Sequence, residues 1–155
     1  MLGVPILCGE PQKIQSMSTK SGAKRIFQQA DVPTSLAAYD IYTEEEFYSS
    51  LARLIAGNPY VNQWIFKIDD EFNSRGHAWF NTENVKLPSE LRRKKGTAEA
   101  AKLERAATLK TGGDAAGASV SITEDVIEEL QARLIREVPK YAKLSVPQLY
   151  DGDWR

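Results

Sequence analysis

The chain has 155 residues, which fits one domain or one domain with an appendage. Its net charge of −1 excludes a global field that would gather nucleic acid or an anionic membrane surface. No apolar run approaches the roughly 18–20 residues that a membrane helix needs. Because Cys8 is the only cysteine, an internal disulfide is excluded. We expect a buried, inert thiol and a reducing, cytoplasmic compartment.

The first predicted element is a short apolar strand at residues 4–8, which Gly9, Glu10 and Pro11 interrupt. A lone strand at this place has no neighbour in sequence with which to pair. We therefore expect residues 1–12 to be the remnant of a strand from a preceding domain.

A helix is predicted from about Thr19 to Ala30, capped by Ser18 or Thr19 and stopped before Pro33. A short strand is predicted at Tyr39–Tyr42.

The most clearly marked helix follows Thr43. In Thr43-Glu44-Glu45-Glu46 the Thr43 hydroxyl can accept from one free amide while Glu46 reaches back to the Thr43 amide, which is a capping box. The apolar residues of the next turns fall on one stripe, namely Phe47, Leu51, Leu54 and Ile55. Gly57-Asn58-Pro59 predicts the helix end, with a left-handed residue before the proline.

A β-hairpin is predicted from Gln63–Ile68 and His77–Phe80, joined by the polar loop 69–76. The first strand alternates, so Trp64, Phe66 and Ile68 share one face while Ile65 and Lys67 share the other. Because His77 is the only histidine and no cysteine lies near it, we do not expect a metal site there.

Composition changes after residue 91. Residues 92–121 contain hardly any large apolar residue and predict a solvated insertion, helical around 97–109 and otherwise flexible. Ser121-Ile122-Thr123-Glu124 predicts a second capping box, and Pro139 should end or kink the helix that follows. Outside the apolar stripe of that helix we expect a Glu129–Arg133 pair. The stripe consists of Val126, Ile127, Leu130, Leu134, Ile135 and Val138.

These elements predict an α+β (α/β-type) fold, with short helices packed on a small, mainly antiparallel sheet and a C-terminal amphipathic helix. After the remnant strand, we expect an N-terminal domain at 13–91, the insertion at 92–121, and the C-terminal helix and tail at 122–155.

Lys20 and Lys24 lie four residues apart at the start of the first predicted helix, and so on one face. Cations at a helix N-terminus oppose the helix dipole, which costs roughly 0.3–1 kcal/mol each. An anion held by the backbone amides and both ammonium groups would explain the placement. The alternative is two exposed lysines whose dipole effect solvent screens.

Lys67 and the loop after it are the other candidates. A lysine in mid-strand either lines a ligand cleft or reaches water from an edge strand. Arg75-Gly76 either folds over phosphates, with Gly76 allowing close backbone approach, or forms a solvated hairpin tip. The acidic run Asp69-Asp70-Glu71 argues against a bare phosphate site. The sequence shows no Walker motif, no Gly-x-Gly-x-x-Gly, and no catalytic or metal-ligating set that we would assign.

The order and spacing of these pieces resemble the ATP-grasp superfamily, which includes D-alanine–D-alanine ligase and ATP-dependent carboxylate–amine ligases. The segments Ser18–Arg25 and Phe66–Phe72 are similar to one branch of it, the IQ-motif-containing protein H family of sperm and motile flagella. The resemblance implies that Lys20, Lys67 and the loop Arg75-Gly76 contact ATP phosphates, and Lys24 is a further candidate because it shares the helix face of Lys20. Later acidic residues and an Asn that would bind Mg²⁺ are not recognisable after residue 121.

Two functions remain open. The first is a partial ATP-grasp-like domain that binds ATP phosphates and is not competent alone for ligase chemistry, with Mg²⁺ bound only if the missing half is supplied. The second is a non-catalytic structural or interaction subunit of a ciliary or flagellar (axonemal) assembly. Its partners would be other protein subunits, with neither nucleic acid nor a membrane involved.

Overall fold

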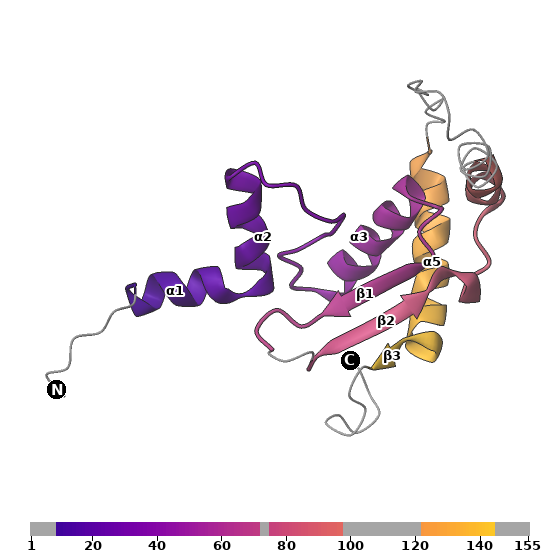
Figure 1. The fold of residues 1–155 in the computed structure, drawn as a ribbon. Coiled ribbons are helices and arrows are strands. Elements are labelled where there is room, and N and C mark those ends of the chain that lie inside the picture. Colours follow the sequence, from indigo (N-terminus) through magenta and orange to yellow (C-terminus); the bar gives the residue numbers. More distant parts are fainter. Residues whose placement is uncertain (1–8, 72–74, 98–121, 145–155) are drawn as a thin grey trace, which may run out of the picture.

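A three-stranded antiparallel sheet with helices on one face forms the centre of the computed structural model, which describes residues 9–71, 75–97 and 122–144 (Figure 1). The elements in chain order are α1 (Pro11–Ser18), α2 (Lys20–Gln29), α3 (Glu44–Gly57), β1 (Gln63–Lys67), β2 (His77–Asn81), the 3-10 turn η1 (Thr82–Asn84), α5 (Glu124–Tyr141) and β3 (Lys143–Leu144). Residues 89–97 are also helical. The predicted α+β class is confirmed.

The predicted hairpin forms two of the three strands of the sheet, β1 and β2. β1 and β2 pair antiparallel in one continuous register, which sets Trp64 opposite Phe80 and Lys67 opposite His77. β1 ends at Lys67, one residue earlier than predicted. The sequence did not predict β3, which pairs with β2 through Leu144 opposite Ala78. The strand order β1-β2-β3 makes β1 an edge strand of the described sheet.

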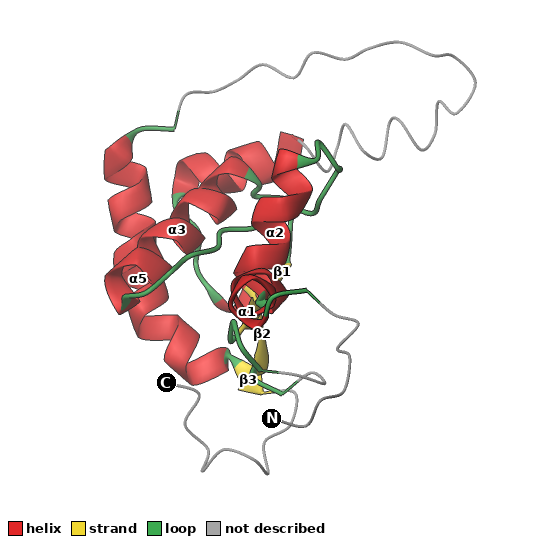
Figure 2. Cartoon of the chain, turned by 90° about the vertical axis from the view of Figure 1, so that its left-hand side faces the viewer, coloured by secondary structure: helices red, strands yellow, loops and turns green. Residues whose placement is uncertain are grey.

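The hydrophobic core lies between the inner face of the sheet and the helices α3 and α5, which lie side by side on that face (Figures 1 and 2). Each of these elements buries most of its predicted apolar stripe, because a residue pattern with the period of the helix or strand places those side chains on one face. The exception on the first strand is Ile68, which follows β1 and is 45% exposed. The most deeply buried large side chains include Ile55, Phe80, Leu91, Leu130, Leu134 and Val138.

The capping box at the start of α3 is confirmed. The Thr43 hydroxyl accepts from the Glu46 amide at 3.2 Å, and a Glu46 carboxylate oxygen accepts from the Thr43 amide at 3.1 Å. The Tyr42 and Thr43 amides hold the pKa of Glu46 below its usual value. The helix ends at Gly57 as predicted. The prediction of a residue with left-handed backbone conformation at this end is wrong. Asn58 has φ −135° and donates from its side chain to the Leu54 carbonyl instead.

Replacing the cap, Thr43→Ala, should lower the free energy of unfolding by about 1 kcal/mol, because one amide of α3 loses its partner. Thr123→Ala is the matched control, since Thr123 precedes α5 without forming a side-chain cap bond. Urea unfolding followed by circular dichroism measures both. Equal losses in the two variants would contradict the role assigned to the Thr43 hydroxyl.

Two predictions in the first half of the chain need correction. Tyr39–Tyr42 is not a strand. Asp40 there has a left-handed φ of 57°, its carboxylate pairs with Arg25, and its amide donates to the Ser21 hydroxyl, so the segment is held by α2 rather than by a sheet. The helix α1 was not predicted.

The cap of α2 is Thr19, as predicted, and its hydroxyl accepts from the Gly22 amide. Gly22 also permits the close approach of α1, because a Cβ at this position would lie 2.3 Å from the Ser16 carbonyl oxygen.

Around α5 the predictions are partly wrong. α5 begins at Glu124, and Thr123 occupies the N-cap position without a side-chain cap bond. Ser121, on which the predicted capping box depends, lies outside the described residues. The helix continues through Pro139 to Tyr141 rather than ending there. Ile135 is 47% exposed, at the rim of the stripe. The predicted Glu129–Arg133 pair forms.

Several predictions fall outside the part of the chain that the structure describes. These are the strand at 4–8, Cys8, most of the insertion at 92–121 including the helix at 98–109, and the tail from 145 onward.

Candidate functional site

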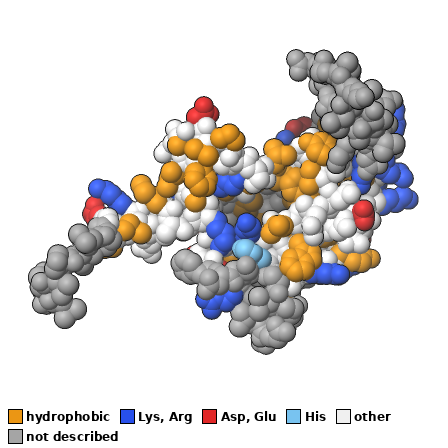
Figure 3. Space-filling view, in the orientation of Figure 1, with side chains coloured by type: hydrophobic (Ala, Val, Ile, Leu, Met, Phe, Trp, Pro, Cys, Tyr) orange, Lys and Arg blue, Asp and Glu red, His pale blue; other side chains and the backbone are white. Residues whose placement is uncertain are grey.

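The outer face of the sheet, turned away from α3 and α5, combines apolar and cationic side chains. Ile65 lies opposite Trp79 in the register, and the next pair along the same face is Lys67 opposite His77. Ile65 is 59% exposed and Trp79 is 38% exposed. We call these two pairs the outer-face patch. Figure 3 shows the histidine in pale blue beside Lys and Arg side chains, on the side of the molecule where the sheet lies in front of the helices.

Lys20 reaches the end of this patch from α2. Its ammonium group donates to the Ile68 carbonyl at 2.5 Å and to the Glu71 carbonyl at 2.6 Å. The pKa of His77 is lowered, first by burial and then by the positive charges of Lys67 and Lys20. The structure therefore places the Lys20 ammonium group at Ile68, the residue that follows Lys67, although the two lysines are far apart in sequence.

Asp69 binds the N-terminus of α2. Its backbone carbonyl accepts from the Lys20 amide at 3.2 Å, and its carboxylate accepts from the Ser21 amide at 2.6 Å. The third free amide of the helix, that of Gly22, donates to the Thr19 hydroxyl. All three leading amides of α2 thus have partners within the chain, which is how the helix end avoids unsatisfied donors.

These hydrogen bonds affect the pKa of the Asp69 carboxyl group. Burial raises the pKa of its carboxyl group, but hydrogen bonds from the Ser21 amide and the Ser21 and Thr19 hydroxyls, together with the Lys20 charge, hold the pKa below its usual value. The carboxylate is therefore charged where the helix dipole favours an anion.

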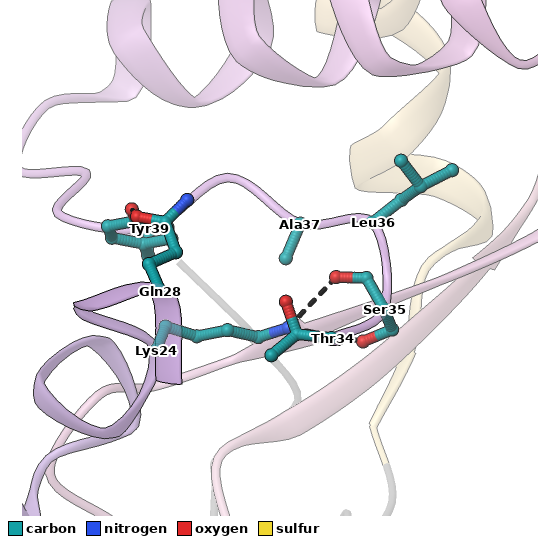
Figure 4. Close-up of a pocket in the computed structure, with 7 residues that line it drawn as sticks. All are labelled: Lys24, Gln28, Thr34, Ser35, Leu36, Ala37 and Tyr39. Carbon is teal, nitrogen blue, oxygen red and sulfur yellow. Dashed lines mark hydrogen bonds between the residues drawn. The ribbon is translucent and has the colours of Figure 1, made fainter. Parts of the chain in front are cut away.

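Lys24 contacts a different segment of the chain from the one that Lys20 contacts. Its ammonium group donates to the Ser35 carbonyl at 2.9 Å and to the Ser35 hydroxyl at 3.2 Å (Figure 4). It lines an open hollow of about 220 Å³ with residues of the 34–39 loop and Gln28. The two lysines that the helical spacing places on one face thus contact different segments.

Arg75 and Gly76 lie at the base of the hairpin. Arg75 Nε is 3.8 Å from a Glu71 carboxylate oxygen. Gly76 is buried with a left-handed φ of 64°, and its carbonyl accepts from the Ile68 amide at 2.8 Å. The described contacts of Gly76 therefore close the hairpin. The loop tip, residues 72–74, lies outside the description.

Sequence reasoning missed two participants. Trp79 was counted only as a strand residue, and its place beside Lys67 depends on the hairpin register, which the loop length alone does not specify. Asp69 was interpreted as a source of repulsion, whereas it fills the N-terminus of α2. Its position one residue past the strand end was a signal, but only the packing of α2 against that end shows the contact.

Among residues 9–71, 75–97 and 122–144, no group of three His, Cys, Asp or Glu side chains is placed to hold a metal ion. Within those ranges, no helix has the length and apolarity needed to cross a bilayer.

The described residues thus define an α+β domain whose small antiparallel sheet carries lysine and exposed apolar side chains on the face turned away from α3 and α5. Residues 11–140 match the family described as "IQCH-like, ATP-grasp", which is most of the chain. The chain therefore belongs to the IQCH-like ATP-grasp family, and the predicted resemblance is confirmed.

A curated relative supports this assignment. The chain is 44% identical to "IQ motif-containing protein H" of the zebrafish Danio rerio over 85 residues. That alignment covers 55% of the chain and only 8% of the zebrafish protein. No solved structure matches the chain.

Proposed function

We propose that this domain binds the phosphates of ATP at the outer-face patch, with Lys20 and Lys67 as the cationic contacts. The observation that carries the proposal is the bond from the Lys20 ammonium group to the carbonyl of Ile68, the residue after Lys67, at the end of the face that carries the exposed pair Ile65 and Trp79. Membership of an ATP-grasp family supports the same ligand.

The chemistry of the patch fits a nucleotide. Ammonium groups attract phosphate as compact point charges, and an exposed indole beside an aliphatic side chain offers an apolar surface on which a purine base can stack. Adjacent pairs on one sheet face are about 7 Å apart, so base and phosphates of one nucleotide can contact neighbouring pairs. Lys24 and Arg75 remain candidates for outer phosphate contacts.

The proposal is limited to binding. The lysines of the patch would bind a phosphate, whereas phosphoryl transfer also needs positioned metal ions and an acceptor. We propose that Mg²⁺ and ligase chemistry would require residues supplied from elsewhere, on the same native chain or on a partner.

Lys67→Ala should weaken binding of a magnesium-free ATP analogue about tenfold, because one ammonium–phosphate contact is lost. Lys86→Ala is the control, since Lys86 is an exposed lysine on the segment that follows η1, outside the patch. Isothermal titration calorimetry on both variants and the unaltered chain provides the measurement. The proposal is wrong if the unaltered chain does not bind, or if Lys67→Ala binds as well as Lys86→Ala.

A second function is favoured by a different observation. α1 buries no side chain and α2 buries only Ser21 and Gly22, while Ile14, Met17, Ile26 and Phe27 are exposed. We propose, as the alternative, a non-catalytic interaction subunit of a ciliary or flagellar assembly, in line with the family resemblance. Cooperative melting of the isolated chain as a stable monomer would remove the main support for this alternative.

A further inference from the structure

The strand β1 lies at an edge of the sheet. β2 pairs with one side of it, and within residues 9–71, 75–97 and 122–144 no strand pairs with the other side. An open edge presents a row of backbone N–H and C=O groups, on which another extended chain can pair.

The hydrogen bonds at the two ends of the hairpin show which backbone groups of β1 lie on that open side. The Thr82 amide donates to the Asn62 carbonyl at 2.8 Å, and the Ile68 amide donates to the Gly76 carbonyl at 2.8 Å. Hydrogen-bonded and non-hydrogen-bonded pairs alternate along an antiparallel ladder, so the even-numbered residues of β1 bond to β2. The N–H and C=O groups that point away from β2 are therefore those of Gln63, Ile65 and Lys67.

β1 has few of the features that commonly block an edge strand. The strand Gln63–Lys67 contains no proline, and its register with β2 runs without a bulge. Its one charged side chain, Lys67, lies at the strand end, and Ile65 in the middle is 59% exposed. The middle of this edge is thus open to a pairing strand.

The side chains of β1 indicate the chemistry of a strand that would pair there. On the inner face Phe66 is only half-buried, with its ring centroid 4.9 Å from that of Phe47. An apolar side chain beside Phe66 would remove more of this aromatic surface from water. On the outer face, an apolar residue would cover Ile65 and an acidic residue would pair with Lys67.

We propose that the free edge of β1 binds an extended segment of a partner protein, with apolar residues and one acidic residue, as a further antiparallel strand. Only an extended chain places donors and acceptors at the spacing of this edge, which is the mode of recognition called β-augmentation. The antiparallel orientation continues that of the sheet. Because the surface is the edge of the sheet, the inference does not rest on nucleotide binding.

The probe is the capped peptide acetyl-Glu-Val-Val-Val-Thr-amide, whose first residue would pair with Lys67 and whose third would pair with Ile65. Two versions carry one backbone N-methyl group each, on the second or on the third residue. In the proposed pairing the third amide donates to the Ile65 carbonyl, whereas the second amide points away from β1. The two versions therefore match in charge and side chains and differ only in the amide that is blocked. Each is titrated into the isotope-labelled chain and followed by NMR.

We expect the peptide methylated at the second residue to bind as the parent peptide does. The peptide methylated at the third residue should bind about tenfold more weakly, because a strand-pairing hydrogen bond is lost. Binding of the parent should slow hydrogen exchange at the amides that point away from β2 and leave those of Trp64 and Phe66, which bond to β2, unchanged.

Ile65→Pro tests the same edge from the side of the chain. The Ile65 amide points away from β2, so proline removes no bond of the hairpin, and edge strands tolerate it. We expect the parent peptide to bind about tenfold more weakly to this variant, and to bind Ile65→Val, which keeps the amide, as it binds the unaltered chain. The methylated peptides test the unaltered chain, so the result does not depend on the folding of the proline variant.

Equal binding of the two methylated peptides, or no binding of the parent peptide, would overturn the proposal. Slow exchange of the Ile65 amide in the peptide-free chain would also overturn it, because another segment of the chain would then already occupy the edge. A dimer of the chain that Ile65→Pro dissociates, measured by sedimentation, would assign the edge to a second copy instead and overturn the proposal as well.

Discussion

Phe80→Ala is expected to lower the free energy of unfolding by about 3–5 kcal/mol, the largest effect of any substitution considered for this chain. Phe80 is 0% exposed, and its ring stacks against Phe66 with a centroid separation of 6.3 Å. It lies on the inner face of β2, in the core cluster that joins the sheet to α3 and α5. Truncation would leave a cavity that these rigid elements cannot fill by relaxing.

A loss of this size is a large part of the total stability of a domain, which is typically about 5–15 kcal/mol. Phe27→Ala is the matched control, because it removes the same atoms from a ring that is 44% exposed on α2. We expect the control to change stability by less than about 1 kcal/mol. Chemical denaturation midpoints for both variants test the difference. Similar losses from the two would mean that the core is not where the structure places it.

Gly76→Ala should destabilise the hairpin by about 1–3 kcal/mol, for two reasons that act together. The left-handed φ of 64° is strained for a residue with a Cβ. That Cβ would also lie 2.8 Å from the Ile68 Cβ, so the strand end must shift to accept it. The shift would weaken the bond from the Ile68 amide to the Gly76 carbonyl.

Gly57→Ala is the control, and we expect an effect of opposite sign. Gly57 is the last residue of α3, and a Cβ there would meet no atom within 4 Å. Alanine should therefore stabilise the helix by up to about 1 kcal/mol. Thermal melts of both variants supply the comparison. A neutral or stabilising Gly76→Ala would contradict the assignment of Gly76 as the residue that closes the hairpin.

Local sequence patterns were sufficient for the elements whose signals lie within a few residues. The capping box at Thr43 and Glu46 needs only spacing, and the alternation from Trp64 to Lys67 needs only the period of a strand. The same patterns failed where a distant segment decides. Tyr39–Tyr42 has strand-like residues but no strand beside it, and Asp40 is held by α2 instead.

For the candidate site, the sequence by itself indicated Lys20, Lys24 and Lys67 as candidates and determined that Lys67 shares a face with Ile65. Only the tertiary structure decided that Lys20 contacts the strand end at Ile68, that Lys24 contacts Ser35, and that Asp69 fills the N-terminus of α2. The physical reason is the range of the interactions. Helix caps and strand faces are set by neighbours in sequence, whereas the partners of a charged side chain are set by which elements pack together. Lys20 and Asp69 are separated in sequence by the rest of α2, all of α3 and all of β1.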